Sequence, residues 1–149
     1  VVDSLRSLLE LPTGTVSQRT FLLTLRSTVP KSVFANAGFS TELNSLANRN
    51  SRFMAHYEQI GAYEPSERAI AITQKFGADS QMRELFFASE PGASLQEASM
   101  QAVRSWLETE PDFPDRSSTG TAYGVELFQS PGSGRWYATC LIVEAPANY

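Results

Sequence analysis

The sequence has very little cysteine and histidine. In 149 residues there is one cysteine, Cys140, and one histidine, His56. A single cysteine cannot close an intramolecular disulfide, and one cysteine with one histidine does not complete any of the usual zinc ligand sets. Cys140 lies in an apolar run, which favours a buried structural thiol over a reactive one. The composition therefore predicts no disulfide, no metal site and no cofactor.

Long apolar runs and clustered positive charge are also missing. No apolar stretch approaches the roughly 20 residues that a membrane-spanning helix needs, so we expect no transmembrane segment. The formal net charge is −4, and the 12 Lys and Arg residues are scattered along the chain. Nucleic-acid-binding domains gather such residues into a patch or stripe, so we expect no nucleic-acid partner.

The chain does have enough apolar residues for one core. Hydrophobic residues make up 42% of the sequence, and its length suits a single domain spanning 1–149. No signal peptide is visible, and the chain starts at Val1 without a methionine. We take that start as a hint that a leader has been removed.

Apolar residues at helical spacing predict several helices. The predicted ranges are residues 1–11, 17–28, 40–58, a short helix from Ser66, 79–88 and 94–110. Ser40 and Asp79 are suitable N-caps, and Ser94 with Glu97 forms a capping box that satisfies two backbone donors reciprocally. Asn50 falls on or near the apolar stripe of its helix, so we expect it to be buried and hydrogen-bonded. The polar side of the same helix is predicted to hold Asn44, Asn48, Arg49, Ser51 and Arg52.

After residue 120 the pattern changes to that of strands. Residues 122–128 alternate, and residues 136–143 are rich in β-branched and aromatic side chains. The second run is apolar on both faces, so we expect it to be covered on both sides. The SPGSG run at 130–134 joins the two strands and precedes no helix, so it is interpreted as a hairpin turn and not a phosphate cradle. The prediction is an α+β fold, with helices first and a C-terminal antiparallel hairpin.

Few residues are candidates for chemistry. His56 could act as a general base or one metal ligand, or it could be a helix-end imidazole with local hydrogen bonds. We favour the second interpretation because no other histidine exists to complete a site. No Gly-x-Ser-x-Gly elbow is present, which disfavours a serine hydrolase. Three aromatic residues could line a pocket but are predicted to pack in the core instead: Trp106, Trp136 and Tyr137.

Several segments carry a resemblance to one known family. EASMQAVRSWLETEPDF (97–113) is similar to a family helix with an A-V-x-x-W core and a following N-P-D-F loop. AYGVELFQSPGSGRWYATC (122–140) is similar to a hairpin G-V-x-x…G-x-W-Y-x-x-C, and EAPANY (144–149) resembles the ending D-P-P-G-N-Y. FSTELNSLANRNSRFMAH resembles the first long family helix. In this order the pieces resemble a divergent member of the CAP superfamily, which contains the cysteine-rich secretory, antigen 5 and pathogenesis-related proteins.

The resemblance implies an α–β–α layered sandwich over residues 34–149, with a long insertion near 74–93. Residues 1–33 would then be a helical N-terminal extension. The metal-binding cleft of the family uses two histidines and a G-E-N element, and its disulfides are a further hallmark. This chain lacks the disulfides and most of that set: only His56 remains, and Ser66-Glu67-Arg68 keeps only the Glu. The possible remnants of the cleft are therefore His56 and Glu67, with no catalytic or metal role assigned to either.

The resemblance implies a non-catalytic, exported binding or structural domain. It would recognise a protein partner or an apolar ligand such as a sterol or another lipid, in an extracellular, periplasmic or organelle-lumen location. One alternative is a luminal accessory subunit of a larger membrane complex, because VVDSLRSLLELP and LNSLA…HYEQIGAYEPSER resemble the small luminal assembly factor of photosystem II, a four-helix bundle. A further alternative is a hydrolase with a degenerate CAP cleft, which requires His56 and Glu67 to face one cavity.

Overall fold

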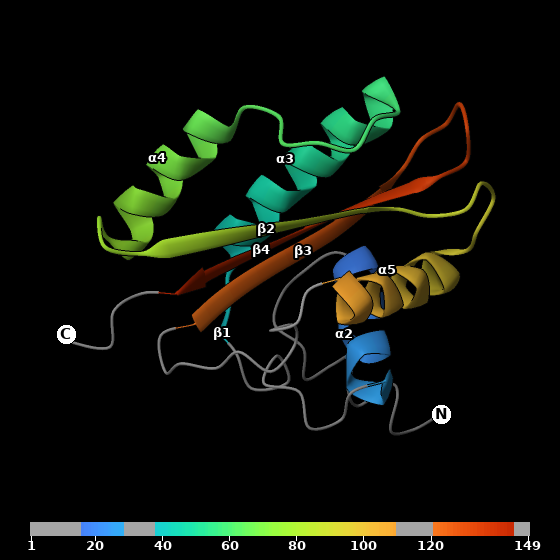
Figure 1. The fold of residues 1–149 in the computed structure, drawn as a ribbon, viewed down its shortest axis with the longest axis horizontal. Coiled ribbons are helices and arrows are strands. Elements are labelled where there is room, and N and C mark those ends of the chain that lie inside the picture. Colours follow the sequence, from blue (N-terminus) through green and yellow to red (C-terminus); the bar gives the residue numbers. More distant parts are fainter. Residues whose placement is uncertain (1–15, 29–37, 110–120, 145–149) are drawn as a thin grey trace.

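The fold is known from a computed structural model that describes residues 16–28, 38–109 and 121–144. Along these residues the elements are α2 (Val16–Thr28), β1 (Gly38–Phe39), α3 (Thr41–Tyr57), α4 (Pro65–Phe76), β2 (Gln81–Ala88), α5 (Leu95–Thr109), β3 (Thr121–Gln129) and β4 (Trp136–Glu144). Figure 1 shows one sheet with α3 and α4 on one side and α2 and α5 on the other. The α+β class predicted from the sequence is confirmed.

One four-stranded sheet runs through the molecule in the order β1-β3-β4-β2. β3 and β4 form the predicted hairpin, and β2 pairs antiparallel with the other edge of β4. β1 is a two-residue strand that pairs parallel with β3. β4 therefore lies between two long strands, with both of its backbone edges occupied.

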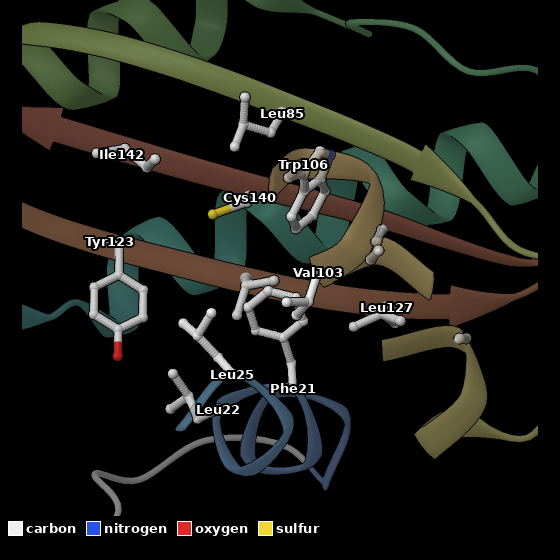
Figure 2. Packing of buried hydrophobic residues seen from close by; sticks show 14 residues of the cluster. Phe21, Leu22, Leu25, Leu85, Val103, Trp106, Tyr123, Leu127, Cys140 and Ile142 are labelled. Carbon is white, nitrogen blue, oxygen red and sulfur yellow. The ribbon is translucent and has the colours of Figure 1, made fainter. Parts of the chain in front are cut away.

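Side chains alternate along β4 between two apolar clusters. Cys140 and Ile142 join the larger cluster with residues of α2 and α5, whereas Leu141 and Val143 pack with residues of α3 and α4. Figure 2 shows the larger cluster, with Phe21 of α2 among its members. Because successive side chains of a strand point to opposite faces, this pattern covers β4 on both sides. The expectation for this strand is confirmed.

The helices begin and end largely where the sequence predicts. The Ser40 hydroxyl accepts a hydrogen bond from the Leu43 backbone N–H, which caps α3. At α5 the Ser94 hydroxyl accepts from the Glu97 N–H at 3.1 Å, and the Glu97 carboxylate accepts from the Ser94 N–H at 3.0 Å. The capping box is therefore confirmed. None of the helices in the described ranges is long and apolar enough to cross a membrane.

α2 is part of the main core. Its residues Phe21, Leu22 and Leu25 are buried, and the Phe21 ring lies 5.6 Å from that of Trp106 on α5. The Trp106 indole N–H also donates to the Phe86 carbonyl of β2 at 3.1 Å, which ties α5 to that strand. Residues 16–28 of the predicted N-terminal extension, 1–33, thus pack into the same core as α5 and the sheet.

One prediction about the elements needs correction. Residues 79–88 were predicted as a helix, but residues 81–88 form β2, and Asp79 lies in a turn before it. Met, Arg, Glu and Leu favour helices intrinsically, but pairing with β4 and packing on both faces override that preference here. The described helices all precede the C-terminal hairpin, as predicted, and the two further strands β1 and β2 lie between them along the chain. The predicted helix at residues 1–11 lies outside the described residues.

The close contact of α3 with β3 depends on Gly124. A Cβ atom at this position would lie 2.4 Å from the backbone nitrogen of Asn44 and 2.5 Å from the carbonyl carbon of Leu43. The first turn of α3 therefore sits directly on the backbone of β3, where no side chain fits. This contact fixes the position of α3, whose other end forms the site described next.

Candidate functional site

A groove of about 750 Å³ lies between the last two turns of α3 and the turn of the β3–β4 hairpin. These two segments lie at the same end of the molecule (Figure 1). The lining residues are Arg49, Arg52, Phe53, Ala55, His56, Tyr57, Glu58, Phe128, Ser130, Pro131 and Gly132. The volume is in the range of pockets that hold small molecules.

Three residues that line the groove carry aromatic rings of Phe or Tyr: Phe53, Tyr57 and Phe128. Phe53 and Tyr57 are four residues apart on α3, so they share one helix face, and their ring centroids are 6.5 Å apart. Tyr63, in the segment after α3, stacks on both at 5.8 and 5.5 Å. The Tyr57 side chain is nonetheless 58% exposed, which is unusual for a large aromatic residue that already has two stacking partners. Tyr57 is therefore an exposed aromatic residue in the lining of the groove.

Positive charge lies beside these rings. The Arg52 guanidinium sits 5.0 Å above the centre of the Phe128 ring, and its Nε donates to Asn48 Oδ1 at 2.8 Å. Arg49 is engaged by carboxylates, at 3.1 Å from Glu64 and 3.5 Å from Glu67. Within the described ranges no carboxylate lies within salt-bridge distance of Arg52.

Glu58 joins the two walls of the groove. It follows α3 with a φ of 53°, in the left-handed region that non-glycine residues seldom adopt. Its carboxylate accepts from the Ser130 hydroxyl at 2.6 Å, across from the hairpin turn. Hydrogen bonds from Ser130 and Ser133 hold the pKa of Glu58 below its ordinary value. The helix end and the hairpin turn are therefore held together by an ionised side chain.

A buried amide supports the segment that leads away from the groove. Asn50 donates from Nδ2 to the Gly61 carbonyl and to Thr139 Oγ1, both at 3.1 Å, and its Oδ1 accepts from the Tyr63 N–H at 2.7 Å. Arg68 of α4 donates to the same Oδ1 at 3.3 Å and pairs with Glu84 of β2 at 2.7 Å. The prediction that Asn50 is buried and hydrogen-bonded is confirmed.

Two residues assigned to the polar side of α3 face the sheet instead. Ser51 donates to the Glu126 carbonyl and contacts Thr139 Oγ1, both at 2.9 Å. Asn44 Nδ2 donates to the Glu126 carboxylate at 3.3 Å. The correction has a simple cause: β3 and β4 carry Glu126 and Thr139 inside the fold, so α3 needs polar residues on its buried face to satisfy them.

The two cleft residues named from the sequence line different hollows. His56 is exposed and lines the groove, with its ring edge-on to Tyr57 at 4.8 Å. Glu67 lines a smaller hollow of about 190 Å³ between α3 and α4. A hydrogen bond with Glu64 and the charge of Glu64 raise the pKa of Glu67 above its ordinary value. In the residues that the structure describes, no group of three or more His, Cys, Asp or Glu side chains is placed to hold a metal ion.

The three aromatic residues that were predicted to pack in the core do so. Trp106 and Tyr137 are buried, and Trp136 is partly buried against the larger cluster, so their assignment to the core is confirmed. Sequence reasoning missed the groove itself. The signal available was the Phe53–Tyr57 pair, but nothing in the sequence placed it opposite the hairpin turn.

Comparisons with known proteins give one structural similarity. No family model matches the sequence, and no curated protein matches it. Among solved structures, an outer surface protein from Borrelia burgdorferi superimposes with a TM-score of 0.63 over 91% of this chain and 100% of that chain. The two sequences are 10% identical, so the similarity establishes a shared fold.

Proposed function

We propose that this chain is a non-catalytic, exported binding domain of CAP type that takes an apolar ligand in the groove at the end of α3. The groove is the observation that carries this proposal. It combines a ligand-sized volume with exposed aromatic surface, chiefly Tyr57, and pockets for small molecules are commonly of this kind. The concave shape of the groove also favours a small apolar ligand over a protein partner.

The assignment to the CAP superfamily and to an exported location has two supports. The α–β–α layers and the C-terminal hairpin agree with the fold that the sequence resemblance implies. The structurally similar Borrelia protein is described as an outer surface protein, which agrees with an exported location. The resemblance to the photosystem II assembly factor implies a four-helix bundle, and the four-stranded sheet in the described residues does not fit that architecture.

The groove favours binding over hydrolysis. A hydrolase built on the remnants of the cleft needs His56 and Glu67 in one cavity, but they line different hollows. Glu58 is the carboxylate that lines the groove among the described residues, and it is already engaged by Ser130. Ser130 also lines the groove, but its hydroxyl donates to Glu58, and in the described part of the structure no hydrogen bond joins His56 to either residue.

Replacement of Tyr57 tests the proposal. Tyr57→Ala removes an exposed ring from the groove, and we expect it to weaken binding of the neutral apolar dye Nile red roughly tenfold, because covering a side chain of this size is worth about 1.5 kcal/mol or more. Ile70→Ala is the matched control, since Ile70 on α4 is also 58% exposed but does not line the groove. Fluorescence titration of the purified chain measures both variants.

Two results would contradict the proposal. One is that the wild-type chain does not bind Nile red saturably. The other is that both substitutions weaken binding equally, which would place the dye on general apolar surface and not in the groove.

A further inference from the structure

We infer that the ligand of this groove is a single-chain amphiphile whose head group is an oxyanion, a carboxylate or a phosphate, held by Arg52. The inference rests on the proposed function, because it assumes that the apolar part of the molecule occupies the groove. It adds the charge of the ligand and names the residue that recognises it.

Arg52 is held in place by a chain of hydrogen bonds from the core. The Glu126 carboxylate is buried between β3 and α3, with a residue exposure of 1%, and it accepts from Asn48 Nδ2 at 2.9 Å. This bond orients the Asn48 amide, whose Oδ1 accepts from Arg52 Nε at 2.8 Å. The flat side of the guanidinium rests over the Phe128 ring at 5.0 Å. An exposed arginine is usually mobile, whereas this one is fixed by contacts at its Nε and at its face.

This arrangement leaves the terminal nitrogens of Arg52 for a ligand. Within the described part of the chain, neither Nη1 nor Nη2 has a carboxylate within salt-bridge distance. A guanidinium that presents two parallel N–H groups matches the geometry of a carboxylate or phosphate, and such bonds are about twice as strong as those between neutral groups. Arg52 therefore offers a preorganised site for an oxyanion at the wall of an apolar groove.

The other charged groups of the groove do not compete with Arg52. Arg49 is already paired with Glu64 and Glu67. The carboxylate of Glu58 is engaged by Ser130, so it does not need a cation from the ligand. A cationic and an anionic ligand meet the same three charged groups: Arg49, Arg52 and Glu58. Among the described residues, Arg52 is the one of the three that lacks an oppositely charged or hydrogen-bonded partner at its terminal nitrogens, which favours the anion. The carbonyls at the end of α3 disfavour an anion, but this effect is confined to the last turn and Arg52 lies further back.

Ligands with one alkyl chain and different head groups test the inference. Dodecanoate, dodecanol and dodecyltrimethylammonium, each below its micelle concentration, compete with Nile red for the wild-type chain. We expect dodecanoate to bind about tenfold or more tightly than dodecanol, since a hydrogen bond to a charged group is worth about 1.5–3 kcal/mol. Dodecyltrimethylammonium is expected to bind most weakly.

The variant Arg52→Gln identifies the residue responsible. In this variant the affinity for dodecanoate should fall to the variant's own affinity for dodecanol, and circular dichroism and urea unfolding show whether the variant is folded. Arg104→Gln is the matched control, because Arg104 is an exposed arginine on α5, on the other side of the sheet. We expect it to bind all three ligands as the wild type does.

The possible failures separate the two proposals. If the three ligands bind the wild type equally, or Arg52→Gln keeps the preference for dodecanoate, the inference about the anion is wrong and the apolar groove stands. If none of the ligands binds and Nile red does not bind, the proposed function itself is wrong. If inorganic phosphate alone competes as well as dodecanoate, the alkyl chain contributes nothing, and the proposed function is again wrong.

Discussion

Cys140 shows how burial decides the chemistry of a single residue. The side chain points from the middle of β4 into the larger cluster and is fully buried. Loss of water around the thiol raises the pKa of Cys140 to about 12. Because the thiolate is the reactive form, this cysteine is inert at neutral pH, as the apolar run around it predicted.

The raised pKa makes stability depend on alkaline pH. In the unfolded chain the thiol titrates near 9.0, so above that pH the unfolded state loses a proton that the native state keeps until about 12. The stabilisation is therefore complete below pH 9 and is lost as the pH rises toward 12, with a slope of about 1.4 kcal/mol per pH unit. Between roughly pH 8 and pH 10.5, the wild-type chain should lose about 2 kcal/mol more than Cys140→Ala, as measured by urea unfolding. Equal losses in the two proteins would show that Cys140 is accessible to water.

At the scale of the element, α5 has a defined start because of its capping box. Ser94→Ala removes the acceptor for the Glu97 N–H and should lower the free energy of unfolding by about 1 kcal/mol. Gln96→Ala is the control, since Gln96 is exposed in the first turn of the same helix and its change should be close to zero. Thermal and urea unfolding of the three proteins measure the difference. A loss at Ser94 no larger than that at Gln96 would mean that water replaces the cap.

Elements with strong local signals were predictable from the sequence, and β2 was not. Ser40 and Ser94 mark helix starts because capping acts within four residues, so their effect is visible in a short window of sequence. β2 has no such signal. Its residues favour a helix locally. The segment is a strand because it pairs along its length with β4, for example Leu85 with Cys140, and β4 lies far along the chain. The two-residue β1 is determined by its partner in the same way.

The groove was unpredictable for a related reason. Phe53 and Tyr57 are recognisable from the sequence as one apolar helix face, which by itself indicates only packing. One wall of the groove comes from α3 and the other from the β3–β4 turn, and Glu58 joins them through Ser130. Because the groove forms only when α3 and the β3–β4 turn pack together, neither segment alone has a sequence pattern that predicts it.

At the scale of the whole molecule, the position of α3 depends on one contact. Gly124→Ala places a methyl group within 2.5 Å of the α3 backbone, so α3 must move or β3 must bend. We expect a loss of roughly 3 kcal/mol in the free energy of unfolding, at the upper end for overpacking, because backbone atoms cannot rotate away. Gly61→Ala is the control: the nearest atom to its new Cβ is 3.9 Å away, so its effect should stay within about 0.5 kcal/mol.

Urea unfolding measures both glycine variants, and Nile red binding reports on the groove at the far end of α3. If Gly124→Ala is as stable as Gly61→Ala, the contact between α3 and β3 is looser than described. If it is destabilised but binds the dye normally, the groove does not depend on how the first turn of α3 is seated.

The place of β4 between β2 and β3 has a consequence for how the protein is made. Both neighbours of β4 are synthesised before it, so β2 and β3 leave the ribosome without a hydrogen-bonding partner for their long edges. Until residues 136–144 emerge, the apolar faces of α2, α3 and α5 have no finished sheet to cover. We therefore expect the sheet to form only once residues 136–144 are available, in one cooperative step, and a nascent chain that stalls before β4 should remain a substrate for chaperones and proteases.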